Sequence, residues 1–148
     1  MSILGVIAAF ALSSTAVPER GQFLAMGAPG ESDVIEAQGI ERTGSGGQVL
    51  MIGVMDHTVE SGGRVLVMVK QFDCPSRRLR DLEGSLYSAD FELLGTVRRP
   101  NAWFSVTPNS PFDRLLDHLC EGAPLAEAGK SYRNVVRDRI ARSDARSR

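Results

Sequence analysis

Two runs of β-forming residues, each led in by a glycine-rich segment, constrain the fold of this chain most strongly. GSGG at 44–47 precedes QVLMIGVMD at 48–56, and ESGG at 60–63 precedes RVLVMVKQFD at 64–73. Two such runs separated by a pair of glycines are typical of a β-hairpin. The pattern predicts two antiparallel strands over these residues.

Side-chain alternation in the second run sets the direction of its cysteine. Val65, Val67 and Val69 fall on one face of the strand, and Phe72 and Cys74 fall on the other. Further strands are predicted near 23–26, 34–40, 78–87, 91–97 and 103–107. No alternation of strands with helices occurs, so we expect an α+β fold with an antiparallel β-sheet of about five to six strands.

Residues 109–122, NSPFDRLLDHLCEG, carry the clearest helix pattern. Ser110 is a favourable N-cap, and Pro111 suits the first helical position, where its missing N–H costs nothing. Gly122 is a natural stop. Apolar side chains recur at helical spacing on one stripe: Phe112, Leu115, Leu116, Leu119 and Cys120. The pattern predicts a C-terminal α-helix that packs on one face of the sheet.

Both cysteines of the chain are therefore expected to point inward. A helix laid across the sheet face that carries Phe72 would bring Cys74 close to Cys120, and a disulfide is the favoured interpretation. A catalytic thiolate at Cys74 is an alternative, because neighbouring arginines would lower the pKa of an exposed thiol. A zinc site is disfavoured, since the chain has no C-x-x-C or H-x-x-x-H pair.

The first residues resemble an export signal. An apolar run at 3–12 is followed by Ser14, Thr15 and Ala16, and ten apolar residues are too few to span a bilayer as a helix. We expect a signal peptide over 1–16 and a mature chain that starts at Val17. A misplaced start codon or a short buried element are the alternatives, and the absence of a cysteine near the cleavage site disfavours a lipoprotein.

Composition describes one ordinary globular domain. The 148 residues are 43% hydrophobic and 24% charged, with a formal net charge of −1, which argues against a dedicated nucleic-acid binder. We expect a single domain over 17–122, followed by a basic tail over 123–148 that is partly helical or disordered. In that tail Tyr132, Val135, Val136 and Ile140 recur at helical spacing.

Catalytic chemistry finds little support in the sequence. The serines lie in no nucleophile-elbow context, and neither His57 nor His118 has a motif partner. We therefore expect no enzyme activity, no catalytic residue, no metal ligand and no cofactor. A group of arginines could instead form a basic patch for acidic polymers or for sulfated or phosphorylated ligands, or could only solvate an edge strand. Its members are Arg77, Arg78, Arg80, Arg98 and Arg99.

Scattered single residues between 34 and 122 resemble the surface-adhesin protein E family of small exported bacterial proteins. They are Asp73, Cys74, Arg77, Arg78, Tyr87, Asp90, Trp103, Val106, Pro108, Ser110, Leu115, Leu116 and Cys120. The resemblance implies a small antiparallel sheet, with a C-terminal helix tethered to one face by a disulfide between Cys74 and Cys120. It also implies structural roles for the matching Asp73, Tyr87, Trp103, Pro108, Ser110 and Leu116.

The same resemblance implies adhesion to host extracellular-matrix proteins and allows a homodimer. We therefore expect a non-enzymatic binding protein that is exported to the periplasm or the outer cell surface and that has no transmembrane helix. The alternative is a periplasmic structural or housekeeping domain with no host ligand. A thiol enzyme that uses Cys74 is the least favoured interpretation.

Overall fold

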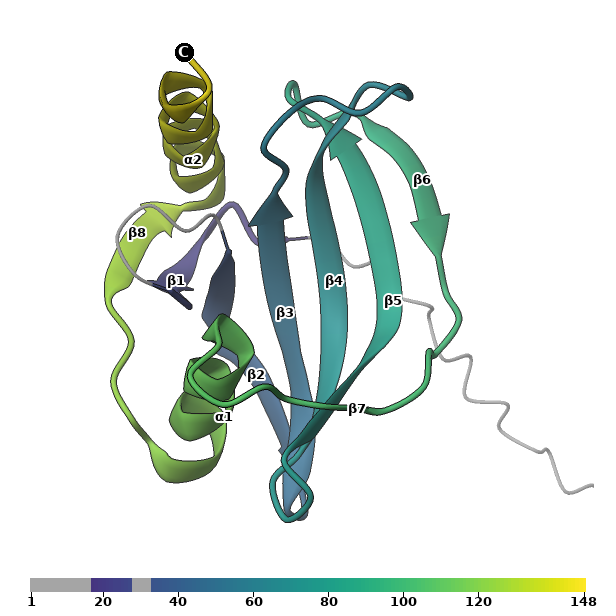
Figure 1. Ribbon diagram of the computed structural model, residues 1–148, viewed down its shortest axis with the longest axis vertical. Coiled ribbons are helices and arrows are strands. Elements are labelled where there is room, and N and C mark those ends of the chain that lie inside the picture. Colours follow the sequence, from purple (N-terminus) through teal and green to yellow (C-terminus); the bar gives the residue numbers. More distant parts are fainter. Residues whose placement is uncertain (1–16, 28–32) are drawn as a thin grey trace, which may run out of the picture.

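The computed structural model describes residues 17–27 and 33–148 (Figure 1). The predicted signal peptide at 1–16 lies outside the described residues. The strands are β1 (Arg20–Ala25), β2 (Val34–Thr43), β3 (Gly46–Val54), β4 (Gly63–Asp73), β5 (Arg78–Ser88), β6 (Leu93–Val97), β7 (Phe104–Ser105) and β8 (Glu127–Ser131). The helices are α1 (Pro111–Glu121) and α2 (Tyr132–Arg146).

The described strands form one antiparallel sheet in the order β6-β5-β4-β3-β2-β1-β8, and β7 pairs with β5 beside this path. The predicted hairpin is confirmed as β3 and β4, with Val54 opposite Val65. Gly62 permits its turn, because a φ of 89° is a conformation that other residues rarely adopt. The α+β fold class is confirmed, although the sheet has eight strands where about five or six were expected.

Two core clusters lie on opposite faces of the sheet, because they take alternate residues of the same strands. The first contains Phe72 and Met51 and is closed by α1, through Leu115, Leu116 and Leu119. The second contains Val65, Val67 and Ile52 and is closed by α2, through Tyr132, Val135 and Val136. In Figure 1, α1 crosses the lower part of the sheet, whereas α2 extends from β8 at the upper left.

The helix predicted from local signals is confirmed as α1. The Ser110 hydroxyl accepts a hydrogen bond from the backbone N–H of Asp113 at 3.3 Å, and Pro111 opens the helix. Gly122 ends it at a φ of 73°, in the left-handed conformation that suits glycine. Leu115 is fully buried, so the predicted apolar stripe is the packing face.

Residues 123–148 are more ordered than a partly helical or disordered tail. β8 pairs with β1, where Phe23 lies opposite Gly129, and α2 follows directly from Tyr132. The apolar residues found at helical spacing face the sheet, and Arg139 and Ser143 are buried on α2 beside them. The sheet and its second cluster thus continue past Gly122. Among the described residues no helix is both long and apolar enough to cross a membrane.

Candidate functional site

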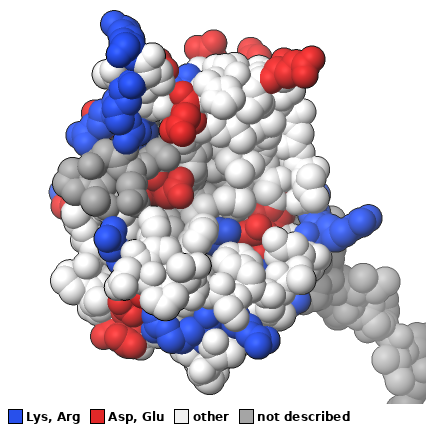
Figure 2. Space-filling model, viewed as in Figure 1, with Lys and Arg blue, Asp and Glu red and all other residues white. Residues whose placement is uncertain are grey.

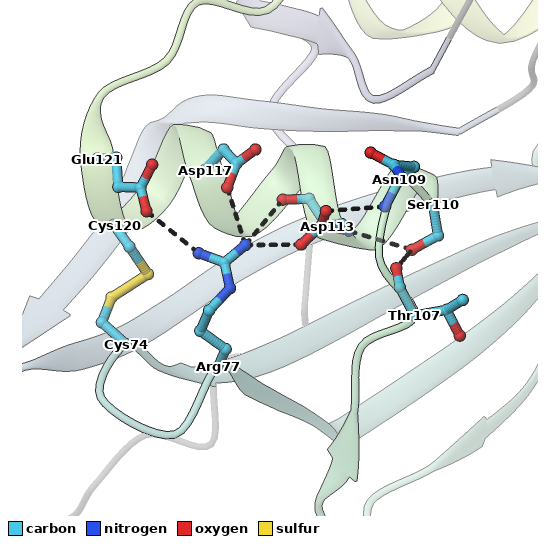
Figure 3. A network of polar contacts seen from close by, with 9 residues as sticks. All are labelled: Cys74, Arg77, Thr107, Asn109, Ser110, Asp113, Asp117, Cys120 and Glu121. Atoms are coloured by element: carbon cyan, nitrogen blue, oxygen red, sulfur yellow. Dashed lines mark hydrogen bonds and ion pairs between the residues drawn. A yellow bond between two sulfur atoms is a disulfide. The ribbon is translucent and has the colours of Figure 1, made fainter.

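A disulfide joins the end of β4 to the last turn of α1. Cys74 and Cys120 are bonded, with their Cα atoms 5.6 Å apart (Figure 3). The alternation of β4 turns Cys74 towards the face that carries Phe72, and α1 packs across that face. The predicted disulfide is confirmed. Cys74 consequently offers no free thiolate for the thiol chemistry that was the least favoured alternative.

Arg77 fastens the β4–β5 turn to α1 beside this disulfide (Figure 3). One terminal guanidinium nitrogen donates to Asp113 Oδ1 at 2.7 Å and to Asp117 Oδ1 at 2.8 Å, and the other lies 3.4 Å from Glu121 Oε1. The three carboxylates are spaced four residues apart and therefore share one face of the helix. Arg77 is thus engaged by three carboxylates of α1 within the fold.

The same contacts shift the pKa of both partners. Hydrogen bonds from its guanidinium, first to Asp113 and then to Asp117, raise the pKa of Arg77. The pKa of Asp113 is lowered, chiefly because the backbone N–H of Asn109 donates to its carboxylate and also because Arg77 donates to it. Both shifts favour the charged forms that hold the turn on the helix.

Arg80 lies on the other side of the sheet from α1. Its Nε donates to Gln71 Oε1 at 2.6 Å, and its guanidinium carbon lies 4.7 Å from the centre of the Trp103 ring. The contact of a guanidinium with the face of an aromatic ring is favourable and restricts both side chains. Arg80 and Trp103 therefore form a fixed, half-buried pair.

The remaining predicted arginines are exposed. Arg78 and Arg99 make no ion pair within 17–27 and 33–148, whereas Arg98 lies 3.8 Å from Glu83 Oε1. Arg78 and Arg80 are two residues apart on β5 and therefore share one face of the sheet. Leu79, which lies between them, points to the opposite face and belongs to the core cluster that α1 closes. The structure therefore separates Arg77 from Arg78 and Arg80.

We call the partly exposed surface formed by Gln48, Gln71, Arg78, Arg80 and Trp103 the open face.

The face that carries α1 shows no comparable single patch. In Figure 2 basic side chains gather over α2 at the upper left, and other basic groups lie along the lower edge and at the right, with acidic side chains among them.

Lys70 and Glu36 are buried ion-bearing residues that the sequence did not single out. Lys70, 2% exposed, pairs with Asp81 at 2.5 Å, and its Nζ lies 5.6 Å from the ring centre of Phe104 and 5.0 Å from that of Phe112. Strand alternation places Lys70 on the same face as Phe72, among apolar residues, and this is the one feature of the sequence that indicates its burial. Glu36, also 2% exposed, accepts backbone hydrogen bonds where the pairing of β2 with β3 shifts register. Both side chains have partners within the fold, so we infer that they stabilise it and do not bind a ligand.

No group of three or more potential metal ligands occurs among the described residues. His118 Nδ1 lies 2.7 Å from the carbonyl oxygen of Ala123, at the end of α1, and His57 is exposed on the loop between β3 and β4. The histidine on α1 therefore serves the helix terminus.

Several of the residues that carried the family resemblance make defined contacts within the fold. The Asp73 carboxylate accepts hydrogen bonds from the backbone N–H of Ser76, at 3.1 Å, and from its hydroxyl. Tyr87 borders the second core cluster, and Leu116 is fully buried in the first. Pro108 stands before Asn109, whose φ is 62°, and this bend leads the chain to the Ser110 cap.

The comparisons with known proteins agree with this architecture. The family model for surface-adhesin protein E matches residues 28–121. This chain belongs to the surface-adhesin protein E family. No curated protein matches it.

Solved structures of Haemophilus influenzae protein E are similar in fold. Crystal form II has a TM-score of 0.53 at 14% identity, over 74% of this chain and 93% of that one. The selenomethionine form has a TM-score of 0.55 at 15% identity, over 72% of this chain and 92% of that one. The structure from a non-typeable strain has a TM-score of 0.53 at 13% identity, over 73% and 80% of the two chains. At these identities the likeness concerns the fold alone.

Proposed function

We propose that this chain is a non-enzymatic, exported binding protein that attaches to host extracellular-matrix proteins through its open face. The observation that carries the proposal is the exposed Arg78, which makes no ion pair with any described residue, beside Arg80 and Trp103. Arginine and aromatic side chains are enriched in binding surfaces, and here they stand on a rigid sheet. Membership in a family of surface adhesins supports the assignment.

Electrostatic attraction would guide this contact. Arg98 and Arg99 follow β6 at the sheet edge and are exposed, and we propose that they add to the positive charge that a partner meets. Exposed arginines raise the rate of encounter with acidic partners, and the effect falls as salt screens the charges. Binding through the open face should therefore weaken with increasing ionic strength.

Binding to a panel of immobilised extracellular-matrix proteins tests the proposal. The variant Arg78→Gln/Arg99→Gln should bind more weakly and show a smaller dependence on salt. The matched control Arg114→Gln/Arg148→Gln removes the same charge from exposed positions elsewhere and should bind like the natural chain. Equal binding by both variants would remove the open face from the contact.

Protease treatment of intact cells tests the location. If the protein is exposed outside the cell, the protease should degrade it while a periplasmic control protein survives. Protection until the outer membrane is permeabilised would favour the alternative, a periplasmic structural or housekeeping domain with no host ligand.

We further propose a second copy of the chain as a partner at β6. This edge strand is exposed along its length, with Leu93 59% and Val97 66% exposed. Antiparallel pairing of two β6 strands about Gly95 would place Leu93 opposite Val97 and Glu92 opposite Arg98. Cross-strand pairs of apolar side chains and of opposite charges stabilise such an edge-to-edge contact.

Cross-linking tests this pairing. A Cβ at Gly95 would meet no other atom within 4 Å, so Gly95→Cys should fold normally. Mild oxidation should then produce a covalent dimer from Gly95→Cys but not from the control Ala89→Cys, which is also exposed. A monomer by sedimentation, with no cross-link, would contradict the pairing.

A further inference from the structure

A hollow of about 620 Å³ lies where the β2–β3 turn meets the start of the β4–β5 turn, next to Trp103. Main-chain pairing holds the two turns side by side, because Gly46 lies opposite Asp73. In Figure 1 these turns lie together at the lower end of the sheet. The walls of the hollow are therefore set by the sheet itself.

Two glycines form the floor of this hollow. Gly46 and Gly47 both line it, and neither carries a side chain that would fill it. A Cβ on Gly46 would stand 2.2 Å from the carbonyl oxygen of Phe72, and Gly47 has a φ of 155°, so neither position accepts another residue without rearrangement. The hollow is a built feature of the GSGG segment.

Amide groups form one wall. Gln48 lies opposite Gln71 on neighbouring strands, and both line the hollow. Gln71 uses its oxygen to accept from Arg80, at 2.6 Å, which leaves its amide N–H groups as donors. The Gln48 side chain makes no hydrogen bond to any part of the chain that the structure describes. The wall therefore offers both donors and acceptors to a ligand.

Charged groups form a second wall. The Asp73 carboxylate is held in place by Ser76, with the backbone N–H of Ser76 at 3.1 Å. Arg78 borders the same hollow and is exposed, with no ion pair in 17–27 or 33–148. A free guanidinium can bind a carboxylate through two parallel hydrogen bonds.

Trp103 supplies the apolar surface. Arg80 stacks on its ring at 4.7 Å, which fixes the ring, and the ring also borders the hollow. Polar side chains dominate the rest of the lining, so a purely apolar ligand would leave their hydrogen-bonding groups unpaired.

We propose that this hollow binds a carboxylated sugar unit. The C–H surface of a pyranose ring fits against Trp103, its hydroxyl groups match the amides of Gln48 and Gln71, and its carboxylate matches Arg78. Asp73, which lies opposite Arg78 on the neighbouring strand, adds a fixed acceptor for hydroxyl groups, and its negative charge opposes a doubly charged phosphate ester more strongly than a single carboxylate. The inference rests on the proposed attachment through the open face, because Gln48, Gln71, Arg78 and Trp103 belong to both.

Intrinsic fluorescence tests the proposal directly, because Trp103 is the single tryptophan of the chain. The probes are glucuronic acid, an oligosaccharide that contains glucuronate, and glucose as a neutral control. We expect a saturable change in emission with an acidic probe and a much weaker response to glucose. A response to glucuronic acid identifies the single unit as sufficient, whereas a response to the oligosaccharide alone identifies a polymer as the source.

Variants separate the hollow from other causes of a fluorescence change. Arg78→Gln should weaken binding of the acidic probe by about tenfold, because one charge-assisted contact is lost. Gln48→Ala should weaken binding of every sugar that binds, and Arg114→Gln on α1 should leave all titrations unchanged. No saturable change with either acidic probe, or an equal response to glucose and glucuronic acid, would overturn the proposal.

Failure here differs from failure of the proposed function. If matrix proteins bind and Arg78→Gln/Arg99→Gln weakens them while no sugar alters the emission, the hollow is not a sugar site but attachment through the open face stands. If glucuronate binds while no matrix protein does, sugar binding in the hollow is confirmed and the proposed binding of matrix proteins is wrong.

Discussion

Arg77 shows how one residue can change role between sequence and structure. Its φ of 49° is uncommon outside glycine, and in this conformation its guanidinium meets two aspartates of α1. A run of arginines beside a cysteine is visible in the sequence, but the carboxylates that occupy Arg77 lie on an element 36 or more positions away. The sequence shows only that these carboxylates are spaced four residues apart and so share one face of a helix.

Arg77→Gln should lower the free energy of unfolding by about 1 kcal/mol at low ionic strength, because it breaks half-exposed ion pairs. The loss should shrink in about 1 M salt, where such pairs are screened. Denaturant unfolding at both salt concentrations measures it, with Arg78→Gln as the neighbouring control that should cost little. An equal cost at both concentrations would show that packing, rather than charge, accounts for the effect.

Tyr132 should make stability depend on pH in alkaline solution. Burial, with smaller contributions from Tyr87 and Glu19 and against that of Arg133, raises its pKa from 10.0 to about 12. The neutral phenol is the form that the fold accommodates, so its contribution is complete below about pH 10 and is lost as the pH rises towards about 12.

Tyr132→Phe keeps the ring that packs against Phe91, at 5.5 Å between centres, and removes the ionisable group. The variant should lose less stability than the natural chain over this pH range, as measured by denaturant unfolding at each pH. Absorbance titration of the two tyrosines of the chain should show one late step that the variant lacks. Parallel pH profiles for the two proteins would refute the assignment.

Among the elements, those with local determinants are the ones that the sequence predicts. α1 is bounded by Ser110 and Gly122, and the β3–β4 hairpin by its glycines, so both follow from neighbouring residues. β8 reads EAGKS, with no alternation of apolar and polar residues, and it forms because β1 offers it a free edge. Sequence patterns therefore do not predict β8, because its pairing partner β1 lies about 100 residues earlier in the chain.

The disulfide decides how firmly α1 is held. Its partners are 46 positions apart, and the loss of a cross-link of that span should cost about 2 to 5 kcal/mol of unfolding free energy. Cys74→Ser should therefore lower the thermal midpoint markedly. Cys120→Ser and the double variant should show nearly the same loss, because each removes the same bond. A Cys74→Ser protein that melts like the natural chain would contradict this role.

At the scale of the whole molecule, the C-terminal elements β8 and α2 are part of what the fold requires. α2 closes the second core cluster through Val135 and Val136, and β8 pairs with β1. Without these elements Phe23 and Val65, both fully buried, would face solvent.

Removal of 123–148 should therefore abolish cooperative unfolding and expose apolar surface that binds a dye such as ANS. Removal of Arg148 alone, which lies beyond the Ser147 cap of α2, should have no effect. Far- and near-ultraviolet circular dichroism with thermal melts measures both. A cooperative, compact 17–122 fragment would instead support a domain that ends at 122.

The sequence by itself determined the class of fold, the hairpin, the capped helix and the pair of cysteines, because alternation, capping and turn residues act over a few neighbouring positions. It also carried the family resemblance, which the family model confirms. Only the tertiary structure decided which arginines are free, that residues 127–146 complete the sheet and its second layer, and that a hollow forms beside Trp103. Those outcomes depend on which distant segments meet, and that is settled by the packing of the whole chain rather than by any local pattern.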